Sequence, residues 1–192
     1  MQTVELKHAY RLLNHGPTVL VGSAHAGRSN VMAAAWAMPL DFDTPKVAVV
    51  VDKSTLTREL IDASGVLSLC VPTVAMKDLV MAAGGMSGKN YPDKLNRCHI
   101  STQSAPLTGV PLVDGCIAQM ECKVLPATAH VAGPHDLILA EVVGAWADER
   151  VFSQGRWHFE DAAPELRSLH HVAGGHFYAI GEAVQALPVV NA

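Results

Sequence analysis

Residues 25–40 read H-A-G-R-S-N-V-M-A-A-A-W-A-M-P-L, and the rest of the chain can be interpreted around this stretch. It begins with polar residues beside Gly27 and continues as a run of alanines around one large ring, Trp36. A core strand normally carries bulky branched side chains, because these cover a pleated surface. Side chains as small as these leave the backbone accessible, so we expect a large flat molecule to lie against this strand. The simpler alternative makes Trp36 an ordinary core or interface aromatic residue.

Composition limits the class of protein. The chain has 192 residues, of which 49% are hydrophobic, enough to bury a core without disulfides or metals. The net charge is −4 and no lysine or arginine cluster occurs, which argues against nucleic-acid binding. There is no C-x-x-C pair, no secretory segment, and no apolar run near the roughly 18 residues of a membrane span. We expect one cytoplasmic domain over residues 1–192, with its core at about 10–185 and no membrane association.

The hydrophobic pattern predicts a mainly β fold, a β-barrel with appended α-helices. Strands are expected at residues 18–24, 30–38, 45–51, 66–71, 113–125, 128–131, 137–146 and 176–180. The first two should form a hairpin, and the nearly continuous apolar run at 45–51 should lie near the centre of the sheet. Helices are expected at 7–13, at 56–64 between a Ser54 or Thr55 cap and Gly65, and at 74–83. Residues 133–136 should form a turn.

A candidate anion site lies at the start of the second helix. Residues 53–58 read K-S-T-L-T-R, which places three hydroxyls and two cations beside free backbone N–H groups. Arg58 can pair with a phosphate in a forked geometry. Residues 87–89, S-G-K, lie in a long glycine-rich loop and offer a further hydroxyl and charge. The alternatives are a capped surface helix and a solvated turn.

Other kinds of site find no support in the sequence. Ten histidines occur, but no H-E-x-x-H motif, and the adjacent His170 and His171 would point to opposite faces of a strand. We therefore expect no metal site. The sequence also lacks G-x-S-x-G and any cysteine in an activated setting, so no catalytic residue is assigned.

Five segments together resemble a known family. They are residues 30–37 (N-V-M-A-A-A-W-A), 54–61 (S-T-L-T-R-E-L-I), 87–95 (S-G-K-N-Y-P-D-K-L), 111–124 (P-L-V-D-G-C-I-A-Q-M-E-C-K-V) and 135–142 (H-D-L-I-L-A-E-V). In this order they are similar to the flavin reductase-like, or flavoredoxin, family, over about residues 10–185. The resemblance implies the FMN-binding split-barrel fold and a homodimer with FMN near the subunit interface.

The resemblance also implies which residues contact the cofactor. Those beside the isoalloxazine ring would be Asn30, Val31, Met32, Ala33, Ala34, Ala35 and Trp36. Those at the phosphate would be Lys53, Ser54, Thr55, Thr57 and Arg58, and those bordering the cofactor would be Ser87, Gly88, Lys89, Lys94 and His135. This chain departs from many relatives, which carry threonine or serine within the alanine run and arginine in place of Lys53.

The resemblance implies an FMN-dependent oxidoreductase, in which FMN accepts hydride from NADH or NADPH. Electrons would then pass to free flavin, to an electron-acceptor protein or to another acceptor. Because the flavin supplies the redox chemistry, the missing protein nucleophile is consistent with this function. The first alternative is a flavoredoxin-type electron carrier that does not use NAD(P)H directly. A weaker one is a split barrel that binds haem or another ligand.

Overall fold

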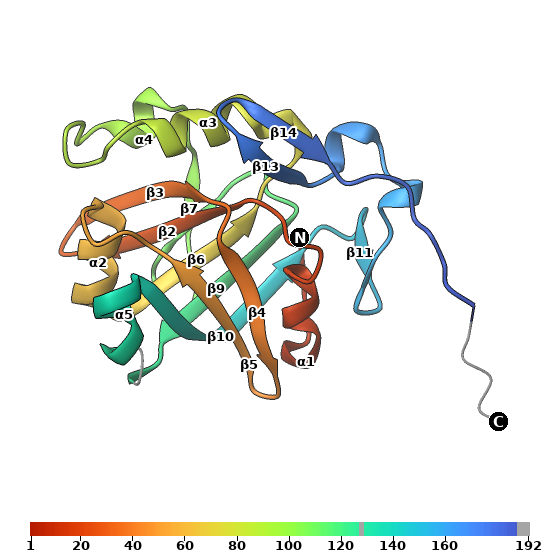
Figure 1. Cartoon of the computed structure of the whole chain (residues 1–192), viewed down its shortest axis with the longest axis horizontal. Helices are drawn as coiled ribbons and strands as arrows, with labels where there is room; N and C mark the ends of the chain where they lie inside the picture. Colours follow the sequence, from red (N-terminus) through yellow and green to blue (C-terminus); the bar gives the residue numbers. More distant parts are fainter. Residues whose placement is uncertain (127–128, 188–192) are drawn as a thin grey trace.

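The structure is a computed structural model that describes residues 1–126 and 129–187. Its main feature is one antiparallel sheet with the strand order β3-β2-β6-β9-β10-β5-β4, in which β1 pairs with β10 (Figure 1). The bounds are β1 (Gln2–Thr3), β2 (Val19–His25), β3 (Arg28–Ala34), β4 (Ala37–Phe42), β5 (Pro45–Val50), β6 (Val66–Val71), β9 (Ala118–Val124) and β10 (Leu137–Ala147). The sheet coils around a core of valines, leucines and isoleucines.

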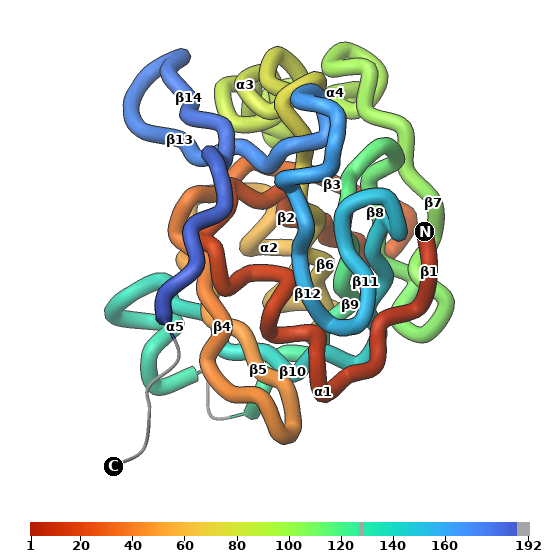
Figure 2. Tube along the Cα trace, turned by 90° about the vertical axis from the view of Figure 1, so that its right-hand side faces the viewer, coloured from red at the N-terminus to blue at the C-terminus, as the bar shows by residue number. Residues whose placement is uncertain are grey.

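Three small antiparallel pairs flank the sheet. They are β7 (Thr102–Ser104) with β8 (Pro111–Val113), β11 (Phe152–Ser153) with β12 (Arg156–Trp157), and β13 (Leu169–Ala173) with β14 (His176–Ala179). In two perpendicular views the β13–β14 hairpin lies beside helix α3 (Lys77–Gly85), above β3 (Figures 1 and 2). A second group of buried apolar residues, including Val31, Val80 and Ala83, fills the space between β3 and this helix.

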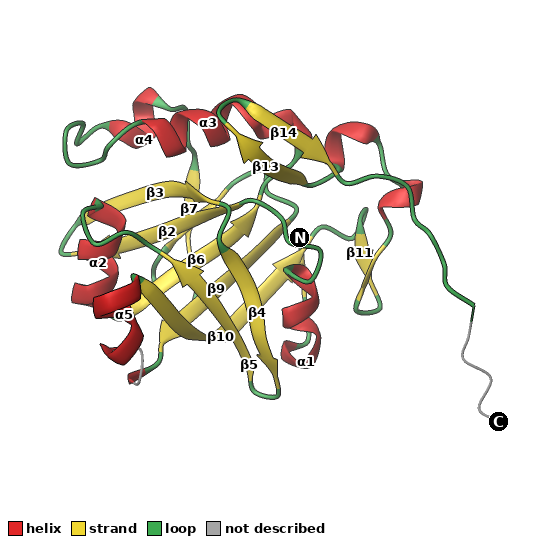
Figure 3. Ribbon diagram, in the orientation of Figure 1, coloured by secondary structure: helices red, strands yellow, loops and turns green. Residues whose placement is uncertain are grey.

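The helices are short and lie on the outside of the sheet (Figure 3). Their bounds are α1 (Leu6–Ala9), α2 (Leu56–Ser64), α3 (Lys77–Gly85), α4 (Lys94–Arg97) and α5 (Ala129–His135), with single 3₁₀ turns at Tyr10–Leu12, Val74–Met76, Phe159–Asp161 and Pro164–Leu166. Helix α2 has the predicted signals, since Thr55 caps it and Gly65 ends it in the left-handed conformation. The predicted barrel with appended helices is therefore confirmed.

The predicted strand at 30–38 is wrong as a single element. It is divided into β3 and β4, which pair with β2 and β5 and stand at opposite ends of the strand order. The break falls at Ala35 and Trp36, where the chain passes from one end of the sheet to the other. Pro39 lies inside β4, beside a bulge. An edge strand tolerates proline because one side of its backbone needs no partner.

Three further predictions need correction. Residues 129–135 form α5 and not a strand followed by a turn, and Thr128 lies outside the described residues. Arg58, 74 positions away, donates to the Ala132 carbonyl oxygen of α5, and local sequence does not reveal a contact of this kind. Strand β5 is next to the edge rather than central, and Val47, Val49 and Val51 of its apolar run are buried in the barrel core. The predicted strand 113–125 is interrupted by a turn at Gly115.

Candidate functional site

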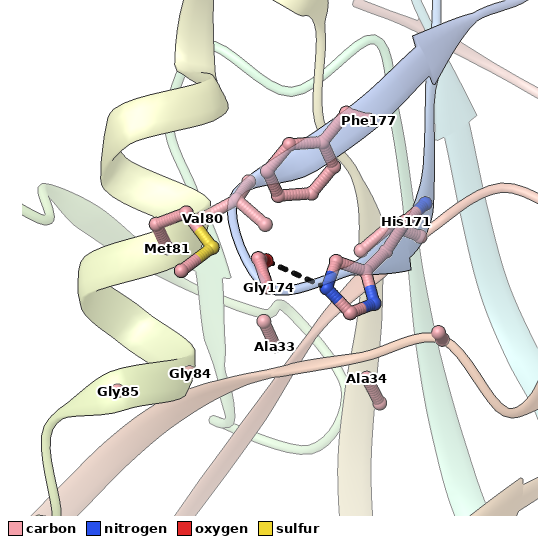
Figure 4. A pocket seen from close by; sticks show the side chains of 11 residues that line it. Ala33, Ala34, Val80, Met81, Gly84, Gly85, His171, Gly174 and Phe177 are labelled. Atoms are coloured by element: carbon pink, nitrogen blue, oxygen red, sulfur yellow. Dashed lines mark hydrogen bonds between the residues drawn. The ribbon is translucent and has the colours of Figure 1, made fainter.

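Two cavities lie end to end along β3. The first, which we call the apolar cavity, has a volume of about 340 Å³ and is bounded by β3, α3 and the β13–β14 hairpin (Figure 4). The second, which we call the hydroxyl-lined cavity, has a volume of about 260 Å³ and lies between β3, the start of α2 and the loop 86–88. Both are lined by Gly84 and Gly85, so the C-terminal end of α3 is where they meet.

Strand β3 contributes to both cavities, and the structure shows which face of the strand each of its side chains occupies. Val31 and Ala33 pack with the residues under α3, whereas Met32 and Ala34 pack against the barrel core. Successive side chains of a strand point to opposite faces, which produces this alternation. A side chain added at Gly84 would contact the methyl group of Ala33, with 3.4 Å between the two Cβ atoms. Small residues on both elements therefore allow the helix to approach the strand and leave a narrow slot.

The hairpin closes the apolar cavity on the side opposite α3 (Figure 4). The main-chain N–H of His171 donates to the Thr18 hydroxyl at 2.8 Å, and the imidazole Nε2 lies 2.9 Å from the Gly174 carbonyl oxygen. Because a carbonyl only accepts, Nε2 carries the proton. The Phe177 ring packs on this imidazole with 5.3 Å between centroids, facing Met81 across the cavity.

The hydroxyl-lined cavity has the donors that an anion requires. Asn30 Nδ2 donates to the Thr57 hydroxyl oxygen at 2.7 Å, which leaves the Thr57 proton free to be donated elsewhere. Helix α2 begins here, and its first amide groups have no acceptor within the helix. Thr55 caps the helix by accepting a hydrogen bond from the Arg58 amide at 3.1 Å. Hydroxyls, first-turn amides and the positive end of the helix dipole thus converge on one space.

Lys94 adds a buried positive charge to this cavity. The residue is only 3% exposed, and its Nζ donates to the Ala83 carbonyl at 2.8 Å. No carboxylate forms an ion pair with it within residues 1–126 and 129–187. Burial lowers the pKa of its ammonium group. A buried ammonium group without a counter-charge is costly, so an anion bound beside it would be stabilised.

The cavities bring together most of the residues that the sequence suggested. The apolar cavity contains Ala33, Ala34 and Ala35, and the hydroxyl-lined cavity contains Asn30, Met32, Ser54, Thr55, Thr57, Ser87, Gly88 and Lys94. The others lie outside both cavities: Val31 is buried among the residues under α3, Lys89 borders a third cavity, and Lys53, Trp36 and His135 are exposed. Trp36 is 74% exposed in a single chain and lines neither cavity.

Arg58 has a different position from the one predicted. Its guanidinium is buried and donates to Asp62, to Asp136 at 3.3 Å and to the carbonyl oxygens of Val51 and Ala132 at 3.0 Å each. It therefore joins α2 to β5 and α5 and is not directed at the cavity. The prediction that it forms a forked contact with a phosphate is not supported by these contacts.

Several residues of the site were not predicted from the sequence. They are Thr18, Val80, Met81, Gly84, Gly85, His171, Gly174 and Phe177 in the apolar cavity, and Leu56, Ala83 and Met86 in the hydroxyl-lined one. The pair Gly84-Gly85 at the end of a helix was the signal available. In the described part of the chain no helix is long and apolar enough to cross a bilayer, and no group of three or more metal-ligating side chains gathers.

Comparison with known proteins identifies the family of the chain. The model of the flavin reductase like domain matches residues 11–167. The chain belongs to the flavin reductase-like family. The uncharacterized protein YddH of Escherichia coli (strain K12) is 48% identical over 186 residues, which span 95% of this chain and 96% of that protein.

Two further similar proteins are informative. A crystal structure of an FMN-binding domain of a flavin reductases-like enzyme from Shewanella baltica OS155 is 49% identical, covers 96% of both chains and superposes with a TM-score of 0.94. The FMN reductase (NADH) RutF of Variovorax paradoxus (strain S110) is 27% identical over 164 residues, or 83% of this chain and 86% of that protein. The barrel described above is thus the split-barrel fold that the resemblance implied.

Proposed function

We propose that this protein binds FMN along β3, with the isoalloxazine ring in the apolar cavity and the phosphate in the hydroxyl-lined cavity. The observation that carries this proposal is the junction of the two cavities at Gly84 and Gly85. FMN has a flat ring at one end and a phosphate at the other, joined by a flexible polar chain. A narrow apolar slot that continues into a space with hydroxyls, helix amides and a buried ammonium group suits that molecule.

The donor set supports the fit at the phosphate end. Thr57 can donate its hydroxyl proton because Asn30 already occupies its acceptor side. Lys94 supplies a buried positive charge without a carboxylate partner, as described above. At the ring end the alanines of β3 leave main-chain groups accessible, since this edge of the sheet has no further strand within the described residues. The Shewanella baltica protein, which is named as an FMN-binding domain, is consistent with this assignment.

We further propose that the protein is an NAD(P)H-dependent flavin reductase. When bound, a flavin accepts a hydride and releases electrons singly or in pairs, so the protein itself needs no nucleophile. The protein's residues would bind and orient it: α3 and the hairpin hold the ring between them, and the start of α2 fixes the phosphate. The name of the Variovorax relative, FMN reductase (NADH), supports NADH as the donor. The electrons would pass to free flavin, a partner enzyme or another acceptor.

The phosphate site can be tested by comparing two flavins. Replacing Thr57 with valine removes the hydroxyl donor, so FMN should bind about tenfold more weakly, the effect expected for one hydrogen bond to a charged group. Riboflavin lacks the phosphate and should bind almost as well as before. Thr57→Ser should restore FMN affinity, and Thr102→Val on the exposed strand β7 should change neither flavin. Equal losses for FMN and riboflavin would show that the phosphate lies elsewhere.

The reaction itself requires a separate measurement. Purified protein should be yellow or take up added FMN, and its flavin absorbance should bleach anaerobically when NADH or NADPH is added. If a chemical reductant bleaches the flavin but neither nucleotide does, the protein is an electron carrier rather than a reductase. Protein that takes up no FMN would contradict both functions.

We also propose that two copies associate through β4. Met38, Leu40 and Phe42 alternate along this edge strand and are all exposed, which leaves an apolar stripe on one face. Trp36, at the start of the stripe, follows Ala35 of the apolar cavity, so a chain seated here would cover the open end of the slot. Residues 183–187, which follow the ion pair between Glu182 and Arg167, are exposed and extend away from the body of the chain, as an arm that a second copy can receive (Figure 1). These features favour a second copy as the occupant.

A further inference from the structure

A third cavity, on the other side of the loop 87–89, has a different chemistry from the flavin site. It has a volume of about 360 Å³ and is lined by residues of β3, of that loop and of the segment leading into α4. Three cations border it, namely Arg28, Lys89 and Lys94. We call it the basic cavity. It shares Asn30, Leu56, Gly88 and Lys94 with the hydroxyl-lined cavity, so the two are adjacent.

The charges around the basic cavity do not balance. Glu59 of α2 is shared, since one of its oxygens lies 2.9 Å from Arg28 Nη1 and the other 4.0 Å from Lys89 Nζ. Asp93 also lines the cavity, but its carboxylate is bound by Arg97 at 2.7 Å. The two cations that share Glu59, together with Lys94, therefore leave an excess of positive charge. An anionic group is the ligand that this excess favours.

The basic cavity also has an aromatic wall. Tyr91 lines it and is 43% exposed, so a face of its ring can be reached from solvent. The Arg97 guanidinium lies over the same ring, 5.3 Å from the centroid, and does not itself line the cavity. A ring held in this way can stack on a nucleobase, because every base has a π face. The cavity is larger than a phosphate alone needs, and Asn96 adds a polar side chain to its wall.

We propose that the basic cavity binds the adenosine 5′-phosphate group of a nucleotide, with the adenine against Tyr91 and the phosphate between Arg28, Lys89 and Lys94. Its position next to the phosphate end of the proposed flavin site allows two sources for this group. It can be the adenylate half of FAD, continuing from the flavin phosphate, or the adenylate half of the hydride donor. The choice between these sources rests on the proposed function, but the presence of the adenylate site does not.

The test uses ADP as the probe, titrated by calorimetry into the full-length protein with and without saturating FMN. Binding should be saturable in both cases and should weaken as ionic strength rises, because the phosphates pair with partly exposed cations. Tyr91→Leu and Arg28→Gln should each weaken ADP about tenfold, in line with the loss of one base stack or one charged contact. Both variants should keep their FMN affinity, since neither residue borders the two cavities assigned to FMN.

A matched control and the contrary outcomes complete the experiment. Arg150→Gln removes another exposed arginine that pairs with a carboxylate, Asp148, and should leave ADP binding unchanged. If ADP does not bind saturably, or if it binds equally well to the Tyr91 and Arg28 variants, the inference is overturned.

Competition then identifies the source. If bound FAD blocks ADP binding and bound FMN does not, the site belongs to FAD. If ADP and NAD⁺ compete with each other, the site belongs to the hydride donor. Failure of the flavin proposal would be recognised separately, as loss of FMN binding with ADP binding retained.

Discussion

The side chains of Asn30 and Thr57 are joined by a hydrogen bond of 2.7 Å that connects β3 to the first turn of α2. Both are buried, and their positions in the chain are 27 residues apart. The bond fixes the helix start relative to the strand and aligns the hydroxyl-lined cavity with the alanine-rich part of β3. It is therefore the contact that sets the geometry of the proposed phosphate site.

This contact should be measurable as a coupling energy. In a double-mutant cycle with Asn30→Ala and Thr57→Val, we expect about 1 kcal/mol of coupling in the free energy of unfolding, the usual net value of a buried hydrogen bond. Urea denaturation of the four proteins provides the measurement. Pairing Asn30→Ala with the distant Thr102→Val should instead give additive effects, within about 0.5 kcal/mol. Additive effects in the first cycle would mean that the bond contributes nothing to stability.

Arg58 should affect stability rather than phosphate affinity. Arg58→Gln breaks a buried ionic network and removes the side-chain donors to the carbonyl oxygens of Val51 and Ala132, so we expect a loss of about 2–4 kcal/mol in urea denaturation. Arg28→Gln removes an exposed pair with Glu59 and should cost no more than about 1 kcal/mol. A stable Arg58→Gln protein that discriminates poorly between FMN and riboflavin would restore the role first predicted for this residue.

Stability should fall in mild acid because of His15. Burial, followed by the nearby His170, lowers the pKa of His15 from 6.5 to about 4. Between these two pH values the unfolded chain binds a proton that the folded chain does not, so stability decreases as the pH falls through this window. The loss is at most about 3–4 kcal/mol, because the pKa differs by about 2.5 units and each unit corresponds to about 1.4 kcal/mol.

The variant His15→Gln separates this effect from other titrations. It should flatten the dependence of the unfolding free energy on pH between about 4 and 6.5. The imidazole packs on Trp157, Phe159 and His170 and bonds the Ser168 hydroxyl at 3.0 Å, so the variant will be less stable at neutral pH. The quantity to compare is the slope of the unfolding free energy against pH. The control variant His25→Gln, at an exposed strand end, should leave this slope unchanged. An unaltered slope in His15→Gln would assign the acid sensitivity to other groups.

The proposed association through β4 predicts a change in oligomeric state. Leu40→Lys places a charge in the middle of the exposed apolar stripe and should raise the dissociation constant of the dimer by about tenfold or more in analytical ultracentrifugation. Leu107→Lys changes another exposed leucine, away from β4, and should leave association unchanged. A wild-type protein that sediments as a monomer at all concentrations would contradict the proposal.

Local sequence patterns were sufficient to predict those features that are determined by residues close together in the chain. The cap at Thr55 and the stop at Gly65 define α2, because helix ends are determined by their own backbone and side-chain hydrogen bonds. The small residues of β3 marked the place where a flat molecule has room. Motif order indicated the family, which the match over residues 11–167 confirmed.

Only the tertiary structure decided what depends on distant segments. Sequence could not show that the chain crosses from one end of the sheet to the other at Ala35, because strand pairing is set by burial across the whole barrel. Nor could it show that Arg58 is directed at α5, or that His171 and Phe177 from the end of the chain form a wall opposite α3. The alanine run thus identified the strand, and the helix and hairpin that pack beside it made that strand one side of a slot.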